Sequence, residues 1–175
     1  MTFLDLARRR YSVRSYRPDP VPDDHLAAVL EAGRLAPTAA NRQPIRILVV
    51  HTAGREAELR RIYDRDWFVE APIILCVCAV PGEAWRRTMY DGRSHADVDA
   101  TIVMDHLVLA AADLGLGTCW IAAFDPAAAR EVLGIPPEGE PMLFTPLGFP
   151  AADAAPSARH VDRRPLEEIV RYERW

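Results

Sequence analysis

Residues 73–80 read IILCVCAV, and this unbroken apolar run decides the fold. A strand with one face in solvent alternates apolar and polar residues, whereas a strand covered on both faces is apolar throughout. The run therefore predicts a central strand with a layer packed against each face of its sheet. The longest apolar stretch, residues 71–80, is also too short to cross a bilayer as a helix. We expect one domain over residues 1–175 and no membrane span.

The stretches around this run predict helices and strands in an irregular order. Apolar residues at helical spacing indicate helices over residues 2–9, 23–36, 52–62, 94–114 and 125–133. Extended, β-rich sequence indicates strands over residues 45–50, 118–121, 142–149 and 170–175. The order alternates imperfectly, so the sequence predicts an α+β fold rather than a regular βαβ winding.

Local features suggest where several elements begin or pair. Thr52 is expected to cap the third helix, with a Glu56–Arg60 ion pair in support. Ser94 is expected to cap the longest helix, with Asp97 in a position resembling a capping box. Pro146 is expected to mark residues 142–149 as an edge strand or a bulge, because proline cannot donate to a sheet ladder.

The helix over residues 94–114 is apolar almost all round, which predicts burial at the domain centre or in a dimer interface. Residues 150–164 lack any period and are expected to cross the surface as an arm. A strand at 170–175, after such an arm, would be suited to reaching a neighbouring subunit. Together these features favour an obligate homodimer.

Composition argues against several classes of function. The formal net charge is −4, and all 21 basic residues are Arg, so no broadly basic face indicates a nucleic-acid binder. The five histidines show no ligand spacing, and Cys76 and Cys78 share a strand face without a further ligand pair, so no metal site is expected. No nucleophile elbow is present. The first residues carry no signal peptide, which predicts a cytoplasmic protein.

Two polar stretches fit neither the core nor a helix. Arg10, Ser12 and Arg14 alternate just beyond the first helix, and residues 36–44, APTAANRQP, form a turn before the strand at 45–50. Guanidinium forks and a hydroxyl suit the oxygens of a phosphate monoester, and Arg163 and Arg164 in the arm offer further charge. We interpret the two stretches as halves of a site for a phosphorylated, planar cofactor.

Four motifs in register resemble the nitroreductase family. They are residues 10–16 (RYSVRSY), 36–44 (APTAANRQP), 114–124 (LGLGTCWIAAF) and 163–170 (RRPLEEIV). The resemblance covers essentially the whole chain in the short form of the family. It implies a homodimer with FMN at the subunit interface. It also implies an α/β sandwich whose mixed or antiparallel sheet is flanked by helices, with C-terminal arms exchanged between subunits.

The resemblance also assigns site residues. The phosphate would be held by the first motif, with Arg163 a better arm candidate than Arg164, and Arg14 would reach the ribityl chain or the pyrimidine edge of the flavin. The turn would come from the partner subunit, and two backbone amides would approach the flavin N5 and O4. The implied cofactor-binding residues are Arg10, Tyr11, Ser12, Arg14, Pro37, Thr38, Ala39, Asn41, Ala122, Ala123, Arg163 and Arg164.

The implied activity is transfer of electrons from NADH or NADPH, through FMN, to nitroaromatic, quinone or related small-molecule acceptors by a ping-pong cycle. The flavin would perform the redox step, so no catalytic side chain is assigned, and Arg14 would tune it. Two alternatives stay open: a flavin-binding module without turnover, and a specialised flavin-dependent dehydrogenase or ring-cleaving enzyme. Residues 63–70 lack the Asn and Lys of many members, Ile45 replaces an aromatic residue, and residues 84–93 are either a lid or a surface connection.

Overall fold

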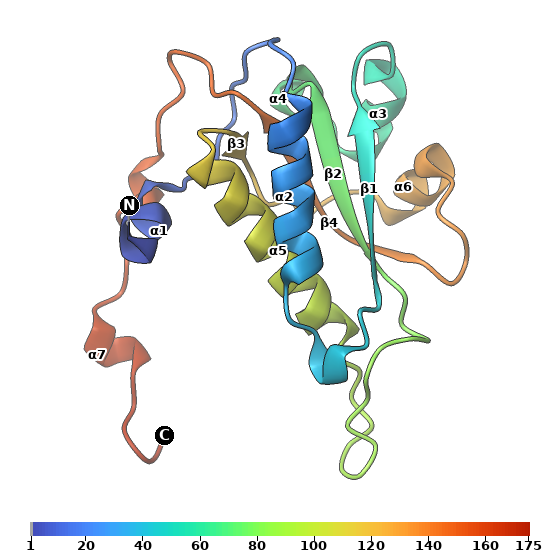
Figure 1. Ribbon diagram of the computed structural model, residues 1–175, viewed down its shortest axis with the longest axis vertical. Coiled ribbons are helices and arrows are strands. Elements are labelled where there is room, and N and C mark those ends of the chain that lie inside the picture. Colours follow the sequence, from blue (N-terminus) through green and yellow to red (C-terminus); the bar gives the residue numbers. More distant parts are fainter. Residues whose placement is uncertain (1) are drawn as a thin grey trace.

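The computed structural model describes residues 2–175 and contains one antiparallel sheet in the order β1-β2-β4-β3 (Figure 1). The strands are β1 (Ile45–His51), β2 (Ile73–Ala79), β3 (Gly117–Thr118) and β4 (Glu140–Gly148). Every residue of β2 is buried, and β2 pairs with β1 on one side and β4 on the other. The prediction of a central strand covered on both faces is confirmed.

Helices cover both faces of this sheet. They are α1 (Phe3–Arg9), α2 (Asp23–Leu35), α3 (Glu56–Ile62), α4 (Asp66–Glu70), α5 (Ala96–Asp113), α6 (Pro126–Leu133) and α7 (Leu166–Ile169), with 3₁₀ turns η1 (Ala39–Asn41) and η2 (Ala158–His160). One core joins α2 and α5 to the sheet, and a second joins α3, α4 and α6 to its other face. The α+β sandwich is therefore confirmed. Within residues 2–175, no helix combines the length and the apolar character that a bilayer crossing requires.

Helix α5 occupies the centre of the first core. Met104, Leu107 and Val108 are fully buried between α2 and the sheet, so much of the apolar surface seen in the sequence is covered within one chain. The helix ends at Asp113, one residue before its predicted end, and Gly115 follows with a left-handed φ of 77°. There the Leu116 amide donates to the Ala111 carbonyl (2.8 Å) and the Gly115 amide to the Ala112 carbonyl (3.2 Å), as in a Schellman motif.

The predicted start of α3 was wrong. Arg55 precedes the helix, and Thr52 is buried and donates its hydroxyl to the Ala71 carbonyl at 2.7 Å. The expected Glu56–Arg60 pair does not form, because the Glu56 carboxylate accepts from the Gly54 amide (3.1 Å). Arg60 pairs instead with Asp66 and Asp64 at 2.7 and 3.5 Å. Thr52 thus ties the end of β1 to the start of β2, a tertiary role that the local sequence does not reveal.

The start of α5 also differs from its prediction. His95 is the N-cap residue, with no side-chain cap hydrogen bond, and Ser94 accepts from the Ala96 amide at 3.3 Å. The capping box with Asp97 therefore does not form. In contrast, Asp125 caps α6 as its residue type implies, accepting from the amides of Ala127 and Ala128 at 2.9 and 3.0 Å.

Pro146 lies in an interior strand, not an edge strand, because β4 pairs with both β2 and β3. Its neighbour Phe144 exchanges hydrogen bonds with Ile121 (2.9 and 3.0 Å), so by strand alternation Pro146 faces the same side. On that side β3 is only two residues long, and a separate bridge follows at Ile121. The missing proline N–H therefore faces a gap in the pairing, which also explains why the strand predicted over 118–121 is interrupted.

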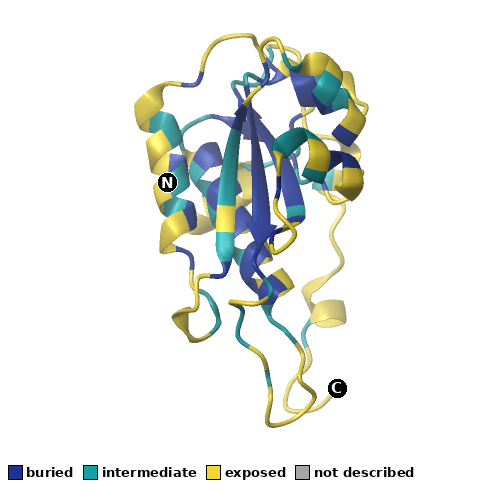
Figure 2. Ribbon diagram, turned by 90° about the vertical axis from the view of Figure 1, so that its right-hand side faces the viewer, coloured by how far each residue is buried: buried dark blue, intermediate teal, exposed yellow. Residues whose placement is uncertain are grey.

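Two surface segments project from the body of the molecule (Figures 1 and 2). Residues 84–93 form a loop held at its base by contact of the Trp85 and His95 rings (4.8 Å between centroids), with Met89 and Tyr90 exposed. The chain after α7 forms no strand within residues 2–175, contrary to prediction, and the Arg174 amide turns back to the Tyr172 carbonyl (2.7 Å). A strand needs a neighbour to pair with, and this segment has none in its own chain.

Gly117 permits the segment after α1 to lie against the sheet edge. A Cβ at Gly117 would lie 2.9 Å from both Cγ atoms of Val13, and the Val13 amide donates to the Thr118 carbonyl at 2.9 Å. We expect Gly117→Ala to lower the free energy of unfolding by about 1–3 kcal/mol through overpacking, measured by urea denaturation. Gly82→Ala is the control, because its Cβ would meet open space, and it should change stability by less than about 0.5 kcal/mol.

The double variant tests the cause of that loss. Val13→Ala removes the methyl groups that the new Cβ would meet, so Val13→Ala/Gly117→Ala should lose less stability than the sum of the two single variants. Strictly additive losses would show that Gly117 matters for its backbone freedom and not for close packing with Val13.

Candidate functional site

The segment after α1 runs beside β3 as a short extended stretch. Ser12 and Thr118 form a parallel bridge, while Val13 and Tyr16 are buried beneath the segment. Successive side chains of extended backbone point to opposite sides. With Val13 turned inward, Ser12 and Arg14 are turned outward. The alternation seen in the sequence thus places these polar groups on one surface.

The C-terminal arm returns to cover this surface. Together the two segments enclose a hollow of about 290 Å³, which is lined by Arg10, Tyr11, Ser12, Arg14, Ser157, Arg159, His160 and Arg163. The Tyr11 hydroxyl donates to the Ala154 carbonyl (3.2 Å), and the His160 Nε2 lies 2.8 Å from the Arg8 carbonyl oxygen. Residues 154–163 therefore pack on their own chain. Of the two arm arginines proposed from sequence, Arg163 lines the hollow and Arg164 does not.

The hollow holds cationic charge that no carboxylate in residues 2–175 neutralises. Across residues 2–175, the guanidiniums of Arg10, Arg14, Arg159 and Arg163 have no carboxylate within 4.0 Å, whereas nine ion pairs serve other arginines. No acidic residue lines the hollow. Four unpaired guanidiniums with a hydroxyl are donors suited to a phosphate dianion. The residues present therefore fit the phosphate end of FMN.

Three further groups lie next to the residues that line the hollow, namely Trp67, Tyr16 and Cys119. Arg14 places its guanidinium carbon 5.8 Å from the centroid of the Trp67 ring, within range of a cation–π contact. Tyr16 donates its hydroxyl to the Val13 carbonyl (2.9 Å), and burial holds the pKa of Tyr16 well above its usual range. Burial also raises the pKa of Cys119, although Arg14 and Ser12 act in the opposite direction. Both groups are therefore neutral supports at physiological pH.

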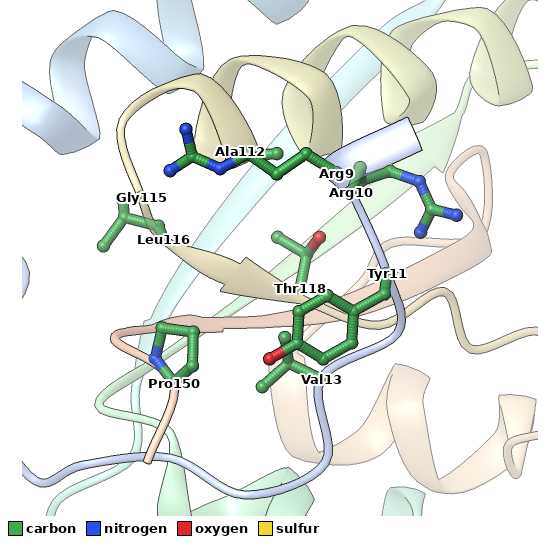
Figure 3. A pocket seen from close by; sticks show the side chains of 9 residues that line it. All are labelled: Arg9, Arg10, Tyr11, Val13, Ala112, Gly115, Leu116, Thr118 and Pro150. Carbon is green, nitrogen blue, oxygen red and sulfur yellow. The ribbon is translucent and has the colours of Figure 1, made fainter. Parts of the chain in front are cut away.

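A smaller hollow of about 180 Å³ adjoins this one, between α1 and the turn after α5. Figure 3 shows that the side chains of Arg9 and Arg10 leave the end of α1 in opposite directions. Arg9 lines the smaller hollow, while Arg10 lines both. The adjacent residues Arg9 and Arg10 thus line different, though neighbouring, surfaces.

Ala122 and Ala123 follow the bridge at Ile121 and precede the cap of α6. Both are exposed, and within residues 2–175 neither amide donates a hydrogen bond. The stretch that contains them starts beside Ser12 at Thr118 and runs in the same direction. Free backbone amides near the basic hollow are consistent with their implied role as donors to a flavin.

The turn that contains Pro37, Thr38, Ala39 and Asn41 does not join the hollow within one chain. It lies at the start of α5, where the Ala39 amide donates to Asp99 Oδ1 at 2.8 Å. The hollow lies near the other end of α5, 16 residues further on. At 1.5 Å per residue these ends are about 24 Å apart. The two halves of the site can meet only if the turn belongs to a second subunit.

Asp99 is the site residue that motif reasoning missed. It is 1% exposed, holds the turn through Oδ1, and has an unpaired buried Oδ2 among the described residues. The turn needs such support, because Ala40, Asn41 and Gln43 all have positive φ values near 52°. The sequence signal for this role was an acidic residue among the inward-facing positions of a largely apolar helix. The remaining missed residues, Trp67, Arg159 and His160, carried no comparable local signal.

Asp99 can be tested by substitution. We expect Asp99→Ala to lower the free energy of unfolding by about 1–3 kcal/mol, because the partly buried Ala39 amide loses its acceptor. Asp99→Asn keeps an acceptor oxygen and should lose less. Asp105, exposed on the same helix, provides the control, and Asp105→Ala should fall within about 0.5 kcal/mol of the parent. Equal losses for Asp99→Ala and Asp99→Asn in urea unfolding would remove the hydrogen bond as the cause.

The chain is similar in sequence to a known protein family and to several of its relatives. The family model described as Nitroreductase family matches residues 7–67 and 54–149. An NADH dehydrogenase of Thermus thermophilus is 31% identical over 94% of this chain and 92% of its own length. An FMN reductase (NAD(P)H) of Bacillus subtilis is 28% identical over 85% of this chain and 66% of its own.

A solved structure shows the same relationship in three dimensions. A nitroreductase family protein from Clostridium difficile 630 superposes with a TM-score of 0.88 and 35% identity, covering all of both chains. The names of these relatives support a general role as an NAD(P)H oxidoreductase. With its family match, its fold and its sequence identity in agreement, the chain belongs to the nitroreductase family.

Proposed function

We propose that the protein is an FMN-dependent NAD(P)H oxidoreductase that works as a homodimer and reduces nitroaromatic, quinone or related acceptors. The observation that carries this proposal is the hollow in which Arg10, Arg14, Arg159 and Arg163 lie without a carboxylate partner in the described chain. Like charges held together repel one another, and a bound phosphate monoester would neutralise them.

The residues around the hollow are assigned distinct tasks. Arg10, Ser12 and Arg163 would hold the phosphate of FMN, with Tyr11 fixing the arm above it. Arg14, oriented by Trp67, would supply a fixed cation that stabilises negative charge at the pyrimidine edge. The free amides of Ala122 and Ala123 would donate hydrogen bonds without competing for hydride. FMN, when bound, supplies the two-electron redox chemistry.

A second subunit would complete the site. The turn over residues 37–41 lies about 24 Å of helix away from its own hollow, and so would serve the partner's flavin. Apolar side chains stand exposed in the tail that follows the arm, with Leu166 72% and Ile169 64% exposed, and most of this tail lacks cover in one chain (Figure 2). Exchange of these tails between subunits would bury them, while residues 154–163 stay packed on their own chain. Dimer formation would thereby link the assembly of the protein to the assembly of its cofactor site.

The reductant and the acceptor would use the site in turn. Gly115 and Gly117 end a helix and begin a strand, so they do not build a separate dinucleotide-binding turn. A nicotinamide would therefore bind directly over the flavin and leave before the acceptor enters, which is a ping-pong cycle. The relatives named as FMN reductase and NADH dehydrogenase support nicotinamide as the electron source.

The purified protein should be yellow and dimeric, and it should lose its flavin absorbance when NADH or NADPH is added without oxygen. A nitroaromatic or quinone should then restore the colour, and initial rates should give parallel double-reciprocal lines. Absorption spectra and light scattering check these outcomes. A colourless protein that binds no added FMN would contradict the proposal, and bound FMN that neither nucleotide reduces would support a binding module instead.

The adjacent arm arginines provide a matched mutational test. Arg163→Ala should weaken FMN binding about 10–100-fold, because a hydrogen bond to a charged group contributes about 1.5–3 kcal/mol. Arg164→Ala removes the same charge outside the hollow and should change the dissociation constant less than about twofold. Arg14→Ala should weaken FMN retention or slow flavin reduction. Fluorescence titration measures the affinities, and equal effects at positions 163 and 164 would show that only general charge matters.

A further inference from the structure

A third cavity lies between the ends of β1 and β2 and the loop that follows α6. It has a volume of about 230 Å³ and a mainly apolar wall that includes Leu48, Val80 and Ile135. Arg46 and Glu83 also line it, and they form an ion pair at 2.9 Å with both side chains about half exposed. The cavity therefore opens to solvent beside this pair. None of its lining residues belongs to the basic hollow.

The cavity forms where the sheet ladder slips. The register between β2 and β4 shifts between Val77, which pairs with Leu143, and Cys78, which pairs with Pro141. Proline has no N–H to donate to the ladder, so Pro141 donates no backbone hydrogen bond at this shift. The loop over residues 134–139, which precedes β4, forms the opposite wall. Of the three thiols, Cys78 lines this cavity, and Cys76 and Cys119 do not.

Cys78 is paired with a second free thiol. Its Sγ lies 3.6 Å from the Sγ of Cys76, which is fully buried behind it. The hydrogen bond from Cys76 lowers the pKa of Cys78 and is supported by the Arg130 guanidinium, although burial opposes both. The same contact, together with burial, raises the pKa of Cys76. The pair is thus asymmetric in position as well, because Cys76 is sealed in the core while Cys78 lines the cavity and is the thiol that an entering molecule can meet.

A disulfide is not the natural product of this pair. Residues i and i+2 of a strand have Cα atoms about 6.6 Å apart, which is near the upper limit for a disulfide. Closing the bond would distort the central strand, on which both cores depend. The thiol pair is better suited to bond formation between Cys78 and a molecule that enters the cavity.

We propose that Cys78 is a covalent modification site for small, apolar α,β-unsaturated carbonyl compounds that bind in this cavity. A 150 Å³ apolar cavity can hold benzene, so the space admits a ring of similar size. The Cys78 thiolate attacks the β-carbon and forms a C–S bond. The π electrons of the C=C bond move to the carbonyl oxygen, and the resulting enolate takes up at its α-carbon the proton that the thiol released to solvent. No group leaves, and neither oxidant nor reductant is required.

The test uses the full-length protein, saturated with FMN, and N-ethylmaleimide as the probe. Intact mass spectrometry should find one adduct, and peptide mapping should place it at Cys78. Cys119 is the matched control, because it is equally buried, 2% against 3% exposed, but does not line this cavity. Cys78 should react at least about tenfold faster. Cys78→Ala should abolish the fast adduct.

The role of Cys76 is tested separately. Cys76→Ala should slow modification of Cys78 by about tenfold at neutral pH if the pKa rises by one unit, because the thiolate is the nucleophile. Cys76→Ser retains a donor and should restore part of the rate. Equal rates at Cys78 and Cys119 would overturn the proposal. So would parallel acceleration of all three cysteines in low urea, since modification would then depend on unfolding and not on the cavity.

Discussion

The apolar contact between α5 and the buried strand β2 determines the layout of the whole molecule. Leu107 and Met104 meet Leu75 and Val77 in a continuous core, and each such side chain contributes about 1.5–3 kcal/mol on burial. Because the helix is held along its length, its two ends become fixed points. Asp99 anchors the turn over residues 37–41 near one end, and Gly115 directs the chain into β3 at the other. Helix α5 thus separates the turn over residues 37–41 from the basic hollow, and a single chain cannot bring these two polar surfaces together.

The basic hollow carries an electrostatic cost that the fold tolerates. The arginines that form ion pairs elsewhere in the protein have exposed side chains, as in the pair of Arg34 with Glu31. Such surface ion pairs contribute little to stability. The four guanidiniums of the hollow have no such partner among residues 2–175. Binding of an anion to the folded protein alone would therefore add stability by mass action. A site that is unfavourable when empty favours occupancy, which suits a resident cofactor better than a passing substrate.

Sequence reasoning succeeded where a residue's role follows from its immediate neighbours. The burial of β2, the end of α5 near residue 114, the start of α6 near residue 125 and the outward alternation of Ser12 and Arg14 all depend on local periodicity and chemistry. It failed where a distant segment determines the role. Thr52 looked like a cap but bonds to Ala71. Trp67 meets Arg14, and Arg159 lines the hollow, only through the tertiary fold. Asp99 lies between these cases, because its position on an apolar stripe was visible but its partner was not.

The interrupted pairing beside β4 broke the strand predicted over residues 118–121, and it also affects the backbone amides of the candidate site. Pro146 offers no N–H toward the segment after Thr118, so the ladder stops there, and the Cys119 amide donates to the Thr145 hydroxyl instead at 3.0 Å. Pairing resumes for the single residue Ile121, and the chain then leaves the sheet. Had the ladder continued past Ile121, the amide of Ala123 would have been used within it, because alternate amides of a strand face the same neighbour. The freedom of that amide to donate to a cofactor therefore depends on the end of the pairing at Ile121.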